Sequence, residues 1–448
     1  MNMKFRAAAV LLMFLVRPAA AFDPFSVYHR NAPEGCLARS VGKGPLALED
    51  LIQIGICNNP NLNRNYMAVK SSEAAYGQSK AAYLPSVDAV GTISREYEKM
   101  QGVRKSGRRN PWAGKVSLSW LLLDFGGRSS TNEAMREYLE ASSASYDAAL
   151  HDTVLAVNMA YFDLLSAQEV LNSNETSVAS YRKSYEETEK KYKVGAASLS
   201  DRLLAKTTYL QSRLAVTQTE NDIRKNQANL AALLNLPPET SFRLKMPPKD
   251  ARAIRLQRDF TVGELIDMAM EARPELKSAE SARRAAEAEI GVAKSAAAPK
   301  LSFYGKGSYA DRWNESHPYT YAGEAGLQID MPIFKGFSNM YGIARARYDY
   351  QQAVYTLKST EDSVKNEVWS AYQDYMTAAA SYEINQDVLK SAEENERVSR
   401  ASYRAGKETI LNLLTVQAQL ATARRDLIVS YYTVLIGKAN LYRAVGKF

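Results

Sequence analysis

The chain has 448 residues, 46% of them hydrophobic, with only 23 glycines and 15 prolines, which excludes a disordered protein and favours long uninterrupted elements. Its length suits two or three ordinary domains or one elongated domain. The formal net charge of +8 is small and scattered, whereas nucleic-acid binding needs a concentrated basic face, so no nucleic-acid partner is expected.

Residues 1–21 have the layout of a secretory signal peptide. Lys4 and Arg6 supply the positive start, residues 7–16 are apolar, and three alanines at 19–21 form a small-residue cleavage site. A membrane anchor is the alternative, but this apolar stretch is too short to cross about 30 Å of hydrocarbon. No later apolar run approaches the roughly 20 residues of a transmembrane helix. The mature chain is therefore expected to be soluble in an oxidising compartment or to cross a membrane as strands.

An N-terminal extension, residues 22–46, contains Cys36, and the only other cysteine is Cys57. An even pair in an exported chain predicts a disulfide. Closing this loop would stabilise the fold by about 3 kcal/mol on the chain-entropy model. Two free structural thiols are the alternative. Neither cysteine follows a lipobox at the cleavage site, so no acylated N-terminus is expected.

The rest of the chain is a tandem duplication, residues 47–236 and 261–448, joined by a proline-rich linker at 237–260. Its two Pro-Pro pairs forbid helix in the linker. Five anchors recur in the same order at offsets of 209 to 214: Leu51 and Leu265, Pro60 and Pro274, Pro85 and Pro299, Gly127 and Gly336, and Gly195 and Gly406. This period far exceeds a solenoid repeat, so two large pseudo-equivalent halves are predicted.

Each half begins with a helix, about 47–82 and 261–297, followed by a β-hairpin, about 84–125 and 299–334. The second strand of each hairpin alternates apolar and polar side chains, which is the strand period. Its apolar positions are Trp112, Val116, Leu118, Trp120 and Leu122 in the first half, and Tyr319, Tyr321, Ala325, Leu327, Ile329 and Met331 in the second. Such strands suit a membrane β-barrel, although a half-buried soluble sheet has the same pattern. Four strands cannot close a barrel, so in a membrane several chains must share one.

A proline-free helical pattern follows each hairpin, at 127–193 and 336–405. At 1.5 Å per residue each helix would reach roughly 100 Å, and patches of heptad spacing predict coiled-coil-like packing. The glycines at the exit from strand to helix, Gly126, Gly127 and Gly336, are interpreted as tight turns.

A glycine ends each long helix. Gly195 and Gly406 are free to take positive φ, and the residues that follow them can cap a return helix. The segments 194–200 and 405–409 are therefore predicted to be the tips of two helical hairpins.

Catalytic patterns are absent from the sequence. The histidines His29, His151 and His317 lack the spacing of a zinc site, and LLDFGGR is not a phosphate-binding loop. No nucleophile–base arrangement is readable. We predict no enzyme activity, no metal and no cofactor.

The ordered motifs AAYLP, LLLDFGGR, PIFKGF, YKVGAASLSDRLLA, YRAGKETILNLLTVQAQLATARRDL and ANLYRAVG resemble the TolC family of bacterial outer-membrane efflux and secretion ducts. The resemblance covers nearly the whole mature chain. It implies a mostly α fold with a small membrane β part, in which a homotrimer closes a twelve-stranded barrel continuous with a long periplasmic α-helical barrel. Substrate would pass through the duct passively. The energy would come from a proton-driven or ABC-type inner-membrane pump, which a periplasmic adaptor joins to the duct.

The resemblance also gives the two tips a role. Val194 and Gly195 in the first half, and Ala405 and Gly406 in the second, match the positions where adaptor hairpins dock in the family. The resemblance implies that the same tips constrict the closed channel.

Gate residues match the family only in part. Tyr403 occupies the position of a tyrosine that ties neighbouring helices shut, and Asp201 that of its carboxylate partner. A basic residue five after that tyrosine in the family is Glu408 here. Two lumen-facing aspartates of the family are Asn412 and Thr415 here, which puts a cation-binding aspartate ring in doubt.

We predict instead that Asp201 pairs with Arg404 or Lys407 at the gate. An exposed pair of this kind is worth under about 1 kcal/mol, which suits a gate that must open. The alternative is that Asp201 only caps a helix.

Two further questions stay open in the sequence. A soluble periplasmic coiled-coil adaptor or scaffold is the alternative to a channel, and it requires water-facing strands. The cargo is either small molecules or a protein exported by a type I system, and the neighbouring pump gene would distinguish the two.

Overall fold

The computed structural model describes residues 24–25, 44–98, 107–109, 112–246, 260–311 and 319–447. The predicted signal peptide, Cys36, most of the predicted N-terminal extension and part of the linker lie outside these residues. The chain divides into two compact units. The sheet unit comprises Met1–Asn31, Met67–Ser143 and Ser278–Leu357, and the helical unit comprises Ala32–Tyr66, Ala144–Lys277 and Lys358–Phe448.

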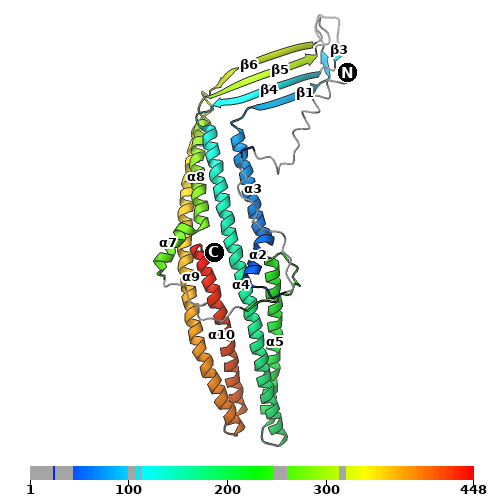
Figure 1. Cartoon of the computed structure of the whole chain (residues 1–448), viewed down its shortest axis with the longest axis vertical. Coiled ribbons are helices and arrows are strands. Elements are labelled where there is room, and N and C mark those ends of the chain that lie inside the picture. The colour runs from blue at the N-terminus through cyan, green and yellow to red at the C-terminus, as the bar shows by residue number, and fades with distance from the viewer. Residues whose placement is uncertain are drawn as a thin grey trace. The chain divides into compact units, whose positions relative to one another are not determined.

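Four antiparallel strands form the sheet of the sheet unit, in the order β1-β4-β5-β6 (Figure 1). Their bounds are Ser86–Ile93 for β1, Trp112–Leu123 for β4, Lys300–Asp311 for β5 and Tyr319–Asp330 for β6. Each half of the chain contributes two strands, and β4 pairs with β5 to join the halves. Among the described residues β1 and β6 are the edges of this sheet. A separate two-stranded sheet, which was not predicted from the sequence, consists of β2 (Glu96–Glu98) and β3 (Gly107–Arg109).

Four helices in the sheet unit pack in the order α3, α4, α8, α9. Ser72 of α3 lies 2.9 Å from Ser142 of α4, measured between the hydroxyl oxygens. Gly291 of α8 lies so close to Ser130 of α4 that an added Cβ would overlap the serine hydroxyl. Arg283 of α8 donates a 3.3 Å hydrogen bond to the Tyr350 hydroxyl of α9. The helix bounds are Pro60–Ala81 for α3, Gly127–Lys193 for α4, Pro274–Ser295 for α8 and Ser338–Arg404 for α9.

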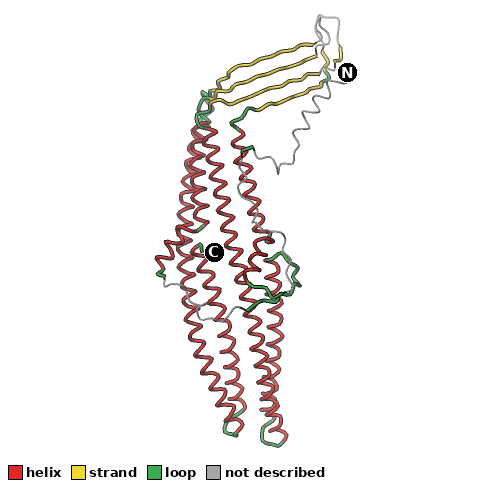
Figure 2. The backbone as a smooth tube through the Cα atoms, viewed as in Figure 1, coloured by secondary structure: helices red, strands yellow, loops and turns green. Residues whose placement is uncertain are grey.

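The helical unit contains α2, α5, α7 and α10 together with the remaining lengths of α3, α4, α8 and α9. Figure 2 shows it as mostly helix, with loops at the hairpin ends. The bounds are Leu48–Asn58 for α2, Leu199–Leu233 for α5, Val262–Ala272 for α7 and Ile410–Val445 for α10. Its apolar core includes Leu51, Val157, Leu164, Leu230 and Leu441, each at most 1% exposed.

The first helix of each half is broken, which corrects the expectation of single helices over 47–82 and 261–297. Asn59, before Pro60, and Arg273, before Pro274, have extended backbones with ψ of 119° and 124°. A proline disfavours the helical conformation of the residue before it, so each helix divides there. Both residues then stabilise another helix end, because Asn59 donates to the carbonyl of Leu233 at 3.2 Å and Arg273 to that of Ala444 at 3.1 Å.

The duplication is regular in the structure. The offset between the starts of α2 and α7 is 214 (262 − 48), and the offset between α3 and α8 is the same (274 − 60). Past the hairpins the offset becomes 211, both from α4 to α9 (338 − 127) and from α5 to α10 (410 − 199). The counterpart of Gly127 is therefore Ser338, and the match of Gly127 with Gly336 drawn from the sequence is wrong by two residues. Positions within these helices have a counterpart at a fixed offset.

One stretch of α4 is long and apolar enough to cross a membrane by length and composition alone, whereas none was expected from the sequence. Of that stretch, 44% is buried within the protein. Core helices of soluble domains have the same property, so this stretch is interpreted as part of the helical core.

Candidate functional site

The register of the four-stranded sheet gathers apolar side chains on one face. Val116 of β4 lies between Ala89 of β1 and Gly307 of β5. Gly307 in turn lies opposite Gly323 of β6. Residues directly opposite one another share a face, and the face alternates along each strand. The same face therefore also carries Val87, Ile93, Trp112, Leu118, Trp120, Leu301, Phe303, Tyr309, Tyr321, Ala325, Leu327 and Ile329.

This apolar face is open in the single chain. Val116 is 52% exposed, Leu327 65% and Ile329 71%. The other face carries Asp88, Lys115, Ser117, Ser119, Ser302, Lys306, Glu324, Gln328 and Asp330. One face suited to lipid and one suited to water is the arrangement of a strand set in a transmembrane barrel.

Aromatic rings mark both ends of the apolar face. The Trp112 and Tyr309 ring centroids are 4.4 Å apart, and those of Tyr309 and Tyr321 are 5.1 Å apart. Toward the helix end of β4, the Trp120 indole N–H donates to the backbone oxygen of Tyr83 at 3.0 Å. Aromatic side chains with a polar group prefer the two interfaces of a bilayer, so the rings fit the borders of a lipid-facing band.

A β-bulge ends the alternation of β4 near the helix. The register shifts between Leu121 and Leu123, so Leu123 lies opposite Leu301, where strict alternation had placed Leu122. Arg128 satisfies the carbonyl groups at this bulge, since its guanidinium donates to Leu121 at 2.6 Å and to Leu122 at 3.0 Å. Bulges of this kind redirect a strand where it leaves a sheet.

Asp124 holds the start of α4. Its carboxylate accepts the backbone N–H of Arg128 at 2.6 Å and lies 3.4 Å from the Arg128 Nε atom. From the sequence, only the glycines of LLLDFGGR were interpreted. An acidic residue just before a helix, with a basic residue one turn later, was the signal for this junction.

Two residues with positive φ make each turn from strand to helix. In the first half they are Phe125 (51°) and Gly126 (91°). In the second half they are Gly336 (56°) and Phe337 (64°). Gly127 needs no positive φ, which corrects its interpretation as a turn glycine. It lies under the end of α8, where an added Cβ would be 2.6 Å from the Ser295 Oγ atom and 3.0 Å from the Asp124 Oδ2 atom.

We expect Gly127→Ala to destabilise the sheet unit by about 1–3 kcal/mol, because overpacking forces α8 away from α4. The measurement is the temperature at which the purified protein loses its helical circular dichroism. Ser295→Gly removes the colliding atoms and should restore most of the loss in the double variant. Gly126→Ala is the control: it has open space but a φ of 91°, so Ser295→Gly should not rescue it. A double variant no better than Gly127→Ala would contradict this explanation.

The two tips of the helical unit end their long helices in the same way. Gly195 and Gly406 have φ of 76° and 74°. After Gly195, the N–H of Ala196 bonds to the Lys191 carbonyl at 2.7 Å, and after Gly406 the N–H of Lys407 bonds to the Ser402 carbonyl at 2.9 Å. This is the Schellman ending, which needs a left-handed residue and therefore glycine.

Asp201 caps a helix, and this corrects its predicted ion pair within the chain. Its carboxylate accepts the N–H of Ser198 at 3.1 Å, and the Ser198 hydroxyl accepts the N–H of Asp201 at 3.0 Å. Arg404 instead pairs with Glu187 at 2.8 Å. Lys407 makes no ion pair among the described residues. The reciprocal cap occupies the Asp201 carboxylate locally.

Tyr403 ties the two hairpins together near the tips. Its side chain is 4% exposed, and its hydroxyl lies 2.9 Å from the Thr188 hydroxyl of α4. The Lys191 ammonium lies 3.8 Å from the ring centroid and donates to the Tyr403 carbonyl at 2.9 Å. Burial raises the pKa of the Tyr403 phenol. The Thr188 hydroxyl donates to the Ser184 carbonyl at 2.8 Å, which leaves the Tyr403 hydroxyl as the donor to Thr188. Thr188 and Lys191 were missed in the sequence, because only the fold brings them to Tyr403.

Tyr403 belongs to a small apolar cluster near the tips, here called the tip cluster: Tyr181, Ala205, Tyr403, Ile410, Leu413 and Leu414. It joins α4, α5, α9 and α10. Nearby, Glu408 accepts from the Ser399 hydroxyl at 2.6 Å and from the Asn412 side chain. These contacts involve all three positions that depart from the family pattern. Glu408 and Asn412 bond to each other, and Thr415 donates to the carbonyl of Leu411 at 2.9 Å.

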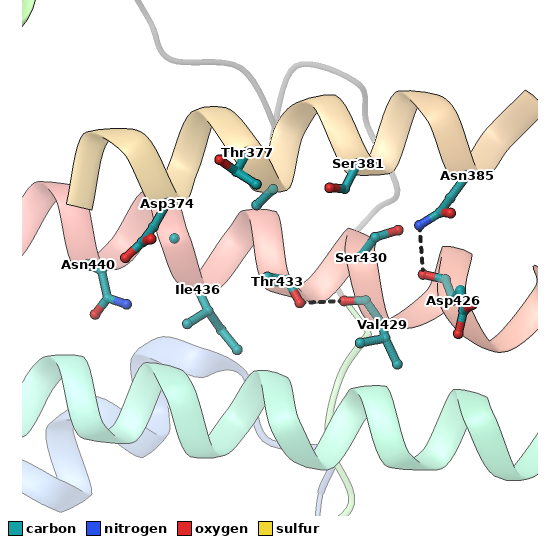
Figure 3. Close-up of a pocket in the computed structure, with 12 residues that line it drawn as sticks. Asp374, Thr377, Ser381, Asn385, Asp426, Val429, Ser430, Thr433, Ile436 and Asn440 are labelled. Atoms are coloured by element: carbon teal, nitrogen blue, oxygen red, sulfur yellow. Dashed lines mark hydrogen bonds between the residues drawn. The ribbon is translucent and has the colours of Figure 1, made fainter. Parts of the chain in front are cut away.

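A polar groove of about 620 Å³ lies between α9 and α10 (Figure 3). In it Asn385 donates to the Asp426 carbonyl at 3.4 Å, and Asp374 lies further along the same helix. A second groove of about 600 Å³ contains Asp163 and Asn174 of α4. The offset from these two residues to Asp374 and Asn385 is 211 (374 − 163 and 385 − 174), which is the repeat offset. The grooves are therefore a duplicated feature of helix pairing.

Cys57 is disulfide-bonded, and Cys36, the only other cysteine, lies outside the described residues. No group of three or more His, Cys, Asp or Glu side chains in the described part of the chain is placed to hold a metal ion.

Comparison with known proteins identifies relatives over most of the chain. The family model described as outer membrane efflux protein matches residues 51–236 and 265–447. Protein CyaE of Bordetella pertussis is 28% identical over 385 residues, covering 85% of this chain and 80% of that protein. The toluene efflux pump outer membrane protein TtgC of Pseudomonas putida is 26% identical over 418 residues, covering 89% of this chain and 83% of that protein.

The structural comparison agrees. The cation efflux system protein CusC of Escherichia coli is 26% identical over 407 residues, covering 89% of this chain and 86% of that protein. A solved structure of CusC superimposes with a TM-score of 0.78 at 21% identity, covering 90% of this chain and 92% of that chain. The predicted mostly helical fold with a small sheet is confirmed.

Proposed function

This chain belongs to the outer membrane efflux protein family, whose members form trimeric channels that work with periplasmic adaptors and inner-membrane pumps, and we propose that it passively conducts small solutes out of the cell. It is an outer-membrane exit duct with a large periplasmic helical part. The homotrimer, adaptor and pump expected from the sequence are confirmed at the level of the family. The family is one of channels rather than enzymes.

The apolar face of the sheet is the observation that best supports a membrane channel. A soluble adaptor or scaffold, the alternative drawn from the sequence, requires strands whose two faces meet water or a protein core. Here one face is apolar across all four strands, with Val116, Leu327 and Ile329 more than half exposed. Lipid covers such a face at no cost in hydrogen bonding, because the ladder satisfies the backbone once the edges pair.

Small solutes are the proposed cargo because of the relatives. TtgC is named for toluene efflux and CusC for cation efflux. Export of a protein remains the second candidate from the sequence. The inner-membrane pump with which the duct works selects between these two cargoes, since the duct itself supplies no energy.

The tips are the proposed contact with the adaptor and the proposed gate. Val194 is 79% exposed beside Gly195, which leaves an apolar side chain in water at a hairpin end. Ala405 and Gly406 occupy the equivalent tip. Tyr403 lies one turn behind that tip and holds it to α4 through Thr188. A partner that binds the tips is therefore able to act directly on this contact.

Deleting the gene tests the cargo. We expect the deletion strain to be killed at several-fold lower concentrations of organic solvents, antibiotics or metal ions, with resistance restored by the gene on a plasmid. The culture medium of both strains is compared for missing proteins. Unchanged resistance together with a missing secreted protein would overturn small-solute efflux in favour of protein export.

A further inference from the structure

The duplicated helices of the sheet unit are packed differently in the two halves. On α4, Gly127, Ala134 and Glu137 are buried, and Ala134 is fully so. Their counterparts on α9, at the repeat offset of 211, are exposed: Ser338, Arg345 and Tyr348. Within the chain α8 covers this face of α4, whereas no described helix covers the same face of α9.

The first helices show the complementary difference. On α8, Ala285 is fully buried and Ser295 is 7% exposed. Their counterparts on α3, at the offset of 214 that relates these two helices, are Ser71 and Ala81, and both are exposed. α3 therefore leaves open the face that α8 uses against α4.

We infer that in the trimer α3 of one copy packs on α9 of the next, in the register that α8 and α4 already show within one chain. The inference rests on the trimer of the proposed function and adds the residues in contact. One packing mode then repeats around the ring, from α4–α8 inside each chain to α9–α3 between chains.

The side chains on the two faces are complementary. α9 presents Tyr341 and Tyr348, which are 76% and 75% exposed and seven residues apart. α3 presents a line of small residues, Ser71, Ala74, Gly77 and Ala81. Large side chains spaced by seven, facing small ones, are the knobs and holes of paired helices. The equivalent face of α4 is covered by α8, whereas these two tyrosines leave a large apolar area of α9 exposed. A second copy of the chain, which brings its own α3, is therefore the favoured partner for this face.

The strands give an independent check of the register. Within the chain Leu118 of β4 lies opposite Gly305 of β5. At the offset of 207 between β4 and β6 (319 − 112), the counterpart of Leu118 is Ala325. At the offset of 214 between β1 and β5 (300 − 86), the counterpart of Gly305 is Gly91. Ala325 and Gly91 both lie on the apolar face. If β6 of one copy pairs with β1 of the next in this register, the apolar face continues from one copy to the next. A shift of the pairing by one residue would place polar side chains on that face.

Cysteine pairs test the inferred contact. In the chain, a Cβ on Gly127 would be 3.2 Å from that of Ser295, close to the separation of about 3.8 Å in a disulfide. The transferred pair is Ala81→Cys with Ser338→Cys. We expect most of the oxidised full-length protein to run as covalent dimers and trimers on a denaturing gel and to return to monomer on reduction. Cys57 is already disulfide-bonded.

Two variants serve as controls. Ser72→Cys with Ser142→Cys joins helices of one chain and should give monomers only. Ala81→Cys with Tyr348→Cys places the second cysteine on the same face of α9 but about 15 Å lower, and should not crosslink. The inference is overturned if the Ala81/Ser338 variant is trimeric by mass in detergent yet forms no intermolecular disulfide, or if the Tyr348 variant crosslinks equally. A trimer without crosslinks leaves the channel function standing, whereas a monomer by mass contradicts both.

Discussion

Val116→Arg is expected to remove the protein from the outer membrane. Val116 lies in the middle of β4 on the apolar face, opposite Ala89 and Gly307, and is 52% exposed in the single chain. An arginine on the lipid face near the bilayer midplane costs about 2–4 kcal/mol. Three copies of the change enter each barrel, so the cost per assembled channel is about three times that amount.

The measurement is the amount of trimer in outer-membrane fractions, and it should fall at least tenfold. Ser117→Arg is the matched control, because Ser117 is the next residue of β4 and lies on the polar face opposite Asp88. This control should assemble normally and change ion selectivity instead. Equal loss of both variants would contradict the assignment of the two faces, and normal assembly of Val116→Arg would place this face in water.

Tyr403→Ala is expected to leave the channel partly open. The change removes a ring that is 4% exposed and joins α9 to α4 in the tip cluster. Emptying a site of this size costs about 3–5 kcal/mol in a packed core. Only the part of this cost that destabilises the closed state relative to the open state changes the gating equilibrium. Each 1.4 kcal/mol or so of that part lowers the ratio of closed to open channels about tenfold. The measurement is single-channel conductance at rest in planar bilayers, which should rise strongly.

Two further variants separate the causes of opening. Tyr403→Phe keeps the ring and loses only the contact with Thr188, so a small change of about 1 kcal/mol is expected. Asp201→Ala loses an acidic side chain in the first turn of α5, worth about 0.3–1 kcal/mol, and the resting conductance should stay near that of the unaltered channel. If Asp201→Ala opened the channel as far as Tyr403→Ala, Asp201 would belong to the gate after all.

Much of the strand and helix pattern could be predicted from local rules. Alternation located β4 and β6, because successive side chains of a strand point to opposite faces. The absence of proline from 127–193 located α4, and Gly195 and Gly406 located the tips. The breaks in the first helices were not predicted. Pro60 and Pro274 are their signal, because a proline disfavours the helical conformation of the residue before it.

The site was less predictable, since its contacts join residues far apart in the chain. The role of Asp201 at the gate stays a prediction from the family pattern, and within the chain its carboxylate accepts from Ser198, three residues away. The pairs that hold the tips, Tyr403 with Thr188 and Arg404 with Glu187, have sequence separations of 215 and 217. No local pattern links such positions.

By itself, the sequence of this protein determined the duplication, the apolar and polar faces of the strands and the glycine endings of the long helices. These depend on backbone geometry and on side-chain period, which act over a few residues. Only the tertiary structure decided which face of α4 is covered and which face of α9 is left open, and which side chains meet at the tips. Those outcomes depend on the register between elements, and register is set by packing between distant parts of the chain.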